Sequence, residues 1–113
     1  MSVVQKPIEN VSVIQPPTTT LDTRNVNEFR ESIQEFLSEK KCLILDMSNV
    51  TFVDSSGLGV LLSALKQTSS VGGSLRLACL QDEVLNLFRL VRMNRVFEIF
   101  ETVDEALADQ EGN

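Results

Sequence analysis

The chain contains no histidine, no tryptophan and no tyrosine. Catalytic devices that pair a serine or a cysteine with a histidine are therefore excluded. Acid–base chemistry would have to rely on a carboxylate, a lysine or a thiol whose pKa is strongly shifted. These absences favour a binding or regulatory protein over an enzyme.

Cysteine is also scarce, and the two that are present, Cys42 and Cys79, lie within apolar runs. We expect them to pack as small buried hydrophobic residues, not to form a disulfide or a metal pair. Two cysteines without a histidine cannot complete a four-ligand zinc site made of thiolates and imidazoles. The sequence therefore predicts no metal and no cofactor.

Positive charge is scarce as well, because 10 lysines and arginines stand against 16 aspartates and glutamates, for a net charge of −6. Proteins bind nucleic acids largely through basic side chains that neutralise phosphates, so no direct nucleic-acid partner is expected. The one concentrated positive stretch contains Arg89, Arg92 and Arg95. We interpret it as the solvated edge of a helix.

Long apolar runs are missing too. None approaches the ~20 residues that a membrane-spanning helix needs, and the N-terminus lacks the basic start and apolar stretch of a signal peptide. A cytoplasmic location without a membrane partner is the resulting expectation. The chain has 113 residues, 42% of them hydrophobic, with three prolines and five glycines. This composition suits a single domain over residues 1–113, with a polar, frayed tail at about 109–113.

Hydrophobic periodicity predicts alternating strands and helices. Short apolar or β-branched runs predict strands at 11–14, 42–45, 75–80 and 96–100, with a weaker strand at 3–4. Three- and four-residue spacing predicts helices at about 26–40, 56–71, 83–91 and 103–107, the last preceded by a capping-box pattern. Strands separated by helices imply parallel neighbours. We therefore expect an α/β fold with a four- to five-stranded mixed, mostly parallel sheet and about four helices.

Several single residues carry expectations of their own. Asn25 is expected to cap the first helix, and Asp82 the third. Phe52 is expected to return the chain to the core, together with the other five phenylalanines. The helical spacing predicts that Val91 points inward, while a partner surface that includes Val91 and Met93 stays an open alternative.

A polar run with two glycines, Asp54-Ser55-Ser56-Gly57-Leu58-Gly59, stands where a helix is predicted to begin. Aspartate and serine commonly cap helices, so an ordinary loop followed by a cap would also contain such residues. Each glycine costs roughly 0.5–1 kcal/mol inside a helix, which indicates close packing on the sheet or close approach of a partner. Local chemistry alone does not choose between Ser55 and Ser56 as the reactive hydroxyl.

In its wider context this run is more specific. The segment 45–61 closely resembles the centre of the STAS domain, the fold of bacterial anti-sigma-factor antagonists. The resemblance covers most of the chain, because Leu21-Asp22 and the segments 72–77 and 91–97 also resemble motifs of that family. It implies a single STAS-type domain.

The resemblance further implies a phosphorylation switch. In that family the serine after the motif aspartate, here Ser55, accepts phosphate from a serine kinase that is itself the anti-sigma factor. The unphosphorylated form binds this kinase and releases the sigma factor, and a serine phosphatase resets the switch. Matching positions near the acceptor and its partner-binding surface are Asp22, Asp54, Ser56, Gly57, Leu58 and Gly59. We expect the free chain to be a monomer.

The physics of a helix N-terminus is compatible with such a switch. Its free N–H groups and positive dipole end can accommodate a phosphate, which carries about −1.5 to −2 charge. We therefore expect the switch to act on a docked partner through charge and bulk, with little backbone change. The alternatives are a non-enzymatic STAS scaffold without a phosphoswitch, a serine enzyme that lacks a histidine base, and a nucleotide-binding site that lacks the third glycine of the dinucleotide motif.

Overall fold

The structure, a computed structural model, describes residues 11–37 and 41–108. The strands are β1 (Val11–Ile14), β2 (Thr20–Leu21), β3 (Cys42–Asp46), β4 (Phe52–Val53), β5 (Ser74–Ala78) and β6 (Glu98–Phe100). The helices are α1 (Val26–Leu37), α2 (Ser55–Ser70), α3 (Asp82–Leu90) and α4 (Val103–Ala108), with a short 3₁₀ turn, η2 (Met93–Arg95). The predicted strand at 3–4, the end of the first helix near 39–40 and the tail at 109–113 lie outside the described residues.

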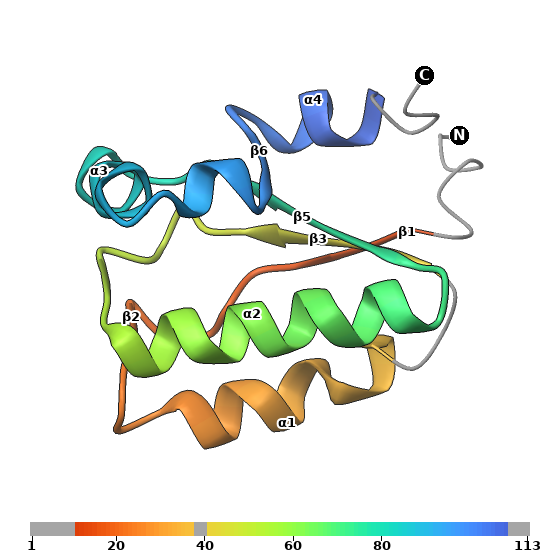
Figure 1. Cartoon of the computed structure of the whole chain (residues 1–113), viewed down its shortest axis with the longest axis horizontal. Coiled ribbons are helices and arrows are strands. Elements are labelled where there is room, and N and C mark those ends of the chain that lie inside the picture. Colours follow the sequence, from red (N-terminus) through yellow and green to blue (C-terminus); the bar gives the residue numbers. More distant parts are fainter. Residues whose placement is uncertain (1–10, 38–40, 109–113) are drawn as a thin grey trace.

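The main sheet has four strands in the order β1-β3-β5-β6, and all of its described pairings are parallel. Helices α1 and α2 lie on one side of this sheet and α4 lies on the other, while α3 lies at one end (Figure 1). The expected α/β class, the parallel pairing and the four helices are therefore confirmed. The notion of a mixed sheet rested on the N-terminal strands, and no antiparallel pairing is present among the described strands.

Strand β3 shows why its apolar run is continuous. Leu43 and Leu45 join the larger core cluster, which also contains buried residues of α1 and α2. Ile44 joins a second cluster with Ala106 of α4. Because alternate side chains of a strand point to opposite faces, a strand covered on both faces needs apolar residues at every position.

Strands β2 and β4 form a second, two-stranded parallel sheet, in which Thr20 pairs with Phe52 and Leu21 pairs with Val53. Two more backbone bonds extend this join: Thr51 donates its N–H to the Thr19 carbonyl at 2.7 Å, and Asp54 donates to Leu21 at 3.1 Å. The small sheet thus holds the chain before α1 against the chain that leads into α2.

Some expectations about single residues were wrong. Phe52 is 52% exposed, because β4 belongs to the small sheet and only its neighbour Val53 turns into the core. Val91 is 41% exposed, because α3 ends at Leu90 and the chain then turns away. Asp82 is the first residue of α3 rather than its cap, and the capping position belongs to Gln81.

Asn25 precedes α1 as expected, but its side chain has another role. Its Oδ1 accepts the Asp22 N–H at 3.0 Å, and its Nδ2 donates to the Thr20 carbonyl at 2.8 Å. The side chain therefore closes the loop before the helix instead of capping the helix itself. The capping pattern at α4 is confirmed, because Thr102 Oγ1 accepts the Glu105 N–H at 3.0 Å.

Candidate functional site

Asp54 organises the start of α2. Its backbone is extended, with φ of −100°, and its Oδ1 accepts the Gly57 N–H at 3.0 Å. This is the usual geometry of an N-cap, in which a side-chain oxygen satisfies one of the free N–H groups of the first turn. The predicted start of the helix near residue 56 is thereby confirmed to within one residue.

The second carboxylate oxygen of Asp54 reaches across to the segment before α1. Its Oδ2 accepts the Thr23 N–H at 3.3 Å and the Thr23 hydroxyl at 3.4 Å. The same hydroxyl lies 3.1 Å from Ser56 Oγ. Thr23 therefore joins the loop before α1 to the first turn of α2, a functional neighbour that the sequence reasoning did not identify.

The two adjacent serines have different surroundings. Ser56 is partly buried and its hydroxyl is engaged by Thr23. Ser55, the first residue of α2, is exposed, and its hydroxyl has no hydrogen-bond partner among residues 11–37 and 41–108. The more accessible and less engaged hydroxyl of the pair is therefore that of Ser55.

The two glycines of the run also differ. A Cβ on Gly57 would lie 2.3 Å from the Leu21 carbonyl oxygen, so no side chain fits there unless the backbone shifts. A Cβ on Gly59 would meet no atom within 4 Å, and Gly59 is exposed. Gly57 is thus required for packing α2 against β2, whereas no contact within the described fold requires a glycine at position 59. Leu58, between them, is half-buried and packs against the main core.

Asp22 is buried and faces Arg24. The Arg24 Nη2 lies 2.8 Å from Asp22 Oδ2, and the Arg24 N–H donates to Oδ1 at 3.0 Å. Chiefly through the side-chain hydrogen bond from Arg24, the pKa of Asp22 falls to about 2. Its carbonyl accepts the N–H groups of Asn25 and Val26, each at 3.0 Å. Asp22 therefore anchors the loop behind Thr23, and none of its hydrogen bonds joins it to α2.

The sequence-predicted site is thus largely one surface. Asp54 through Gly59 form the cap and first turn of α2, and β2 sits beside them through Leu21. The exposed Phe52 stands at the preceding strand, two residues before Asp54. Backbone pairing of β2 with β4 brings residues more than thirty positions apart in sequence to this one corner.

Two kinds of site are not found in the part of the chain that the structure describes. No group of three or more His, Cys, Asp or Glu side chains is placed to hold a metal ion there. No helix within residues 11–37 and 41–108 is long and apolar enough to cross a membrane. Both cysteines are unpaired, and they are partly buried where full burial was expected. Burial raises the pKa of the Cys79 thiol.

Comparison with known proteins identifies the family to which this fold and site belong. The model of the STAS domain matches residues 3–106. The chain belongs to the STAS domain family. A Thermotoga neapolitana protein described as a candidate anti-sigma factor antagonist is 33% identical over 109 residues, which are 95% of this chain and 96% of that protein.

Two further STAS relatives have the same description in their names. The anti-sigma F factor antagonist of Paenibacillus polymyxa is 27% identical over 93 residues, which are 80% of each chain. The crystal structure of a candidate anti-sigma factor antagonist from Thermotoga maritima superposes with a TM-score of 0.80 at 28% identity, over 89% of this chain and 87% of that one. This likeness over nearly the whole length confirms the single STAS fold.

Proposed function

We propose that this STAS domain is an anti-sigma factor antagonist whose binding is switched by phosphorylation of Ser55. The unphosphorylated chain binds an anti-sigma factor that is also a serine kinase. The sigma factor that this kinase had held is thereby released. Phosphate on Ser55 ends the binding, and a serine phosphatase restores it. The names of the relatives support the antagonist role, while the switch rests on the geometry at the start of α2.

The observation that carries the proposal is the contrast between the adjacent serines. A kinase needs a hydroxyl that can enter its active site and that is not engaged elsewhere. Ser55 is exposed and has no hydrogen-bond partner among the described residues, whereas Ser56 is held at 3.1 Å by Thr23. Phosphate on Ser56 would break that contact, but phosphate on Ser55 would break none.

Electrostatics explain how one phosphate could abolish binding without refolding the chain. A phosphate on the first residue of α2 lies at the positive end of the helix dipole, which stabilises negative charge. It also adds about −1.5 to −2 charge next to the Asp54 carboxylate, on a surface that a partner must cover. A loss of about 3 kcal/mol at that interface weakens binding more than 100-fold.

Intact mass spectrometry after incubation with ATP and an anti-sigma factor kinase from the same organism tests the acceptor. We expect one added phosphate on the wild type and on Ser56→Ala, and none on Ser55→Ala. Ser56→Ala is the matched control, because it removes the neighbouring hydroxyl and leaves the Asp54 cap in place. Phosphate that persists on Ser55→Ala would contradict the assignment.

A binding measurement with the same kinase tests the consequence. Wild type and Ser55→Ala are expected to bind it, and Ser55→Asp is expected to bind at least about 100-fold more weakly. If all three variants bind equally and no phosphate is added, the chain acts as a STAS interaction module without a phosphoswitch.

A further inference from the structure

Three arginines cluster where α3 ends. Arg89 lies in the last turn of α3, Arg92 joins it to η2, and Arg95 ends η2. All three are exposed, and within residues 11–37 and 41–108 none has an ion pair or a side-chain hydrogen bond. In a chain with a net charge of −6, a positive cluster without internal partners is an unusual surface, which we call the arginine patch.

Apolar side chains are interleaved with this patch. Leu90 is 80% exposed, Val96 is 46% exposed and Val91 is 41% exposed. One exposed apolar residue is ordinary, but neighbouring ones next to unpaired charges are typical of a surface that binds another molecule.

The backbone at the centre of the patch is unfavourable for the residue that it carries. Arg92 has φ of 65° and ψ of 22°, a left-handed conformation that glycine or asparagine adopts more readily. Only two non-glycine residues of the described chain have positive φ, Cys79 and Arg92. The sequence thus has a long cation at a turn where a smaller residue would fit better, an arrangement that points to a function for the cation.

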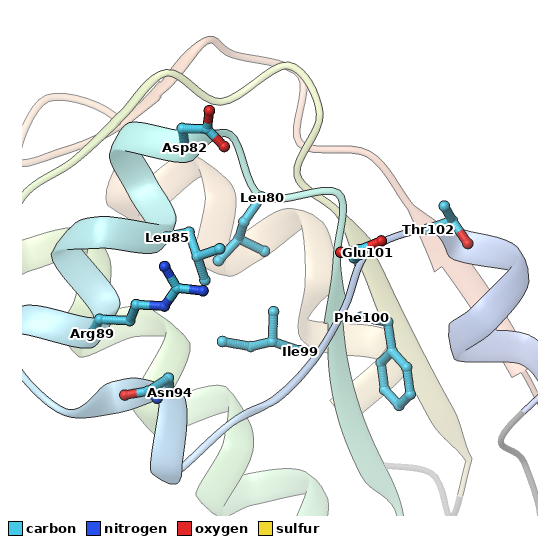
Figure 2. A pocket seen from close by; sticks show the side chains of 9 residues that line it. All are labelled: Leu80, Asp82, Leu85, Arg89, Asn94, Ile99, Phe100, Glu101 and Thr102. Atoms are coloured by element: carbon cyan, nitrogen blue, oxygen red, sulfur yellow. The ribbon is translucent and has the colours of Figure 1, made fainter.

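A pocket of about 590 Å³ adjoins the patch between α3 and the end of β6. Its apolar part is made by Leu80, Leu85 and Ile99, and the Arg89 side chain extends beside Leu85 toward it (Figure 2). Arg89 therefore belongs to both the pocket and the patch, so the two features form one continuous surface.

The opposite side of this pocket carries negative charge. Glu101 lies across it from Arg89 and Asn94, and Asp82 lines it at the start of α3 (Figure 2). A ligand that is negative along its whole length would meet these carboxylates, whereas one that is negative only at the arginine end would not. The charges around the pocket thus fix the orientation of a bound ligand, with its negative end at the arginines.

We infer that the arginine patch and the adjoining pocket form a docking site for an acidic segment of a partner protein, whose apolar side chain enters the pocket. Charge complementarity decides the choice of partner, because three exposed arginines without ion pairs lie within residues 89–95 of an acidic molecule. An anionic membrane fits less well, since a flat, extended surface would also meet the surrounding carboxylates. None of the residues that form the patch or line the pocket belongs to the cap and first turn of α2, so the inference does not rest on the proposed function.

A defined peptide tests this inference. The probe is a short synthetic peptide with aspartates and glutamates at one end and a single leucine beside them, compared with the same peptide in which lysines replace the acidic residues. Two-dimensional amide NMR on the full chain should show shifts at residues 89–96 and around Ile99 with the acidic peptide only. Reversal of all three arginines to glutamate should weaken binding at least about tenfold, and added salt should weaken wild-type binding.

Two controls separate docking from damage to the fold. Arg92→Gly removes one cation and also relieves the left-handed backbone, so it should weaken binding while stability is retained or raised. Lys66→Glu, a charge reversal at an exposed residue of α2, should leave peptide binding unchanged. Equal binding of both peptides, shifts away from the patch, or binding only to vesicles of anionic lipid would overturn the inference.

Discussion

Glycine is required at one position of α2 and free to change at another. A Cβ added at Gly57 would collide with the Leu21 carbonyl oxygen, whereas a Cβ added at Gly59 would meet no atom within 4 Å. Alanine at these two positions therefore gives a matched pair of variants. The gain in helix propensity is the same at both, but a packing clash arises only at Gly57.

We expect Gly57→Ala to lower the free energy of unfolding by about 1–3 kcal/mol, because the added methyl forces α2 away from β2. Gly59→Ala should raise it by about 0.5–1 kcal/mol, because alanine favours a helix and meets no neighbour. Urea unfolding followed by far-UV circular dichroism measures both values. Destabilisation of similar size at both positions would contradict the claim that only Gly57 packs too closely for a side chain.

The Gly59→Ala variant also separates folding from binding. Its stability should rise, so any loss of kinase binding would come from the partner's close approach to the helix and not from unfolding.

Asp22 gives stability a defined pH dependence. Its pKa is about 2 in the folded chain and 3.8 ordinarily, chiefly because Arg24 donates to its carboxylate. The ionised form is therefore favoured by folding, and its contribution is complete above about pH 4. As pH falls from about 4 toward 2, the unfolded chain binds the proton first and that contribution is lost.

Asp22→Asn should accordingly be less stable than the wild type at neutral pH. The difference in the urea midpoint between the two should shrink as pH falls through the range from 3.8 to about 2. A difference that stays constant over this range would contradict the assignment to the Asp22–Arg24 pair.

Sequence reasoning found some residues whose role is local but misplaced the caps at Asn25 and Asp82, and it failed where the partner is distant. Asp54 could be named among the candidate caps of the second helix, because the N–H that it binds is three residues ahead. Thr23 was missed because its partners Asp54 and Ser56 are 31 and 33 residues away. The exposed side of Phe52 was missed for the same reason, since only the pairing of β4 with β2 decides which way that strand faces.

At the scale of elements, the first turn of α2 depends on one carboxylate that serves two segments. Asp54 caps α2 through one oxygen and holds Thr23 through the other. The join between α2 and the loop before α1 therefore relies on this side chain, on the contact between the Thr23 and Ser56 hydroxyls, and on the β2–β4 pairing.

Asp54→Ala should lower the free energy of unfolding by about 1 kcal/mol, the usual effect of losing a cap. Amide hydrogen exchange should accelerate at Gly57 and Thr23, whose N–H groups Asp54 accepts, more than in the main sheet. Asp54→Asn is the control, because its amide oxygen can still accept the Gly57 N–H. Uniform acceleration across β3 and β5 would indicate global destabilisation instead.

The order of elements was predictable, but their exact ends were not. Periodicity located four helices and four main strands, because buried faces impose a repeat on the sequence. Strand β6 proved shorter than its apolar run, beginning at Glu98 because Val96 and Phe97 close the η2 turn. Those ends are set by turns such as the left-handed Arg92, which no periodic pattern encodes.

For the molecule as a whole, a charge at Ser55 should leave the fold unchanged. Ser55 is exposed at the helix start, so Ser55→Asp should alter the free energy of unfolding by no more than about 0.5 kcal/mol. Backbone amide shifts should be confined to residues 22–24 and 54–59. Shifts that spread through β3 and β5 would contradict a switch that acts through surface charge and bulk alone.

The parallel topology determines when the surface around Ser55 forms during folding. Its strands are neighbours only after an intervening helix has been made, because a parallel connection needs a crossover. Thr23 and Asp54, 31 residues apart, therefore meet only in the folded chain. A short peptide that spans residues 46–61 contains Ser55 but not the corner that presents it. The site is thus a conformational epitope, and an enzyme that recognises this corner would distinguish the folded protein from its unfolded or truncated forms.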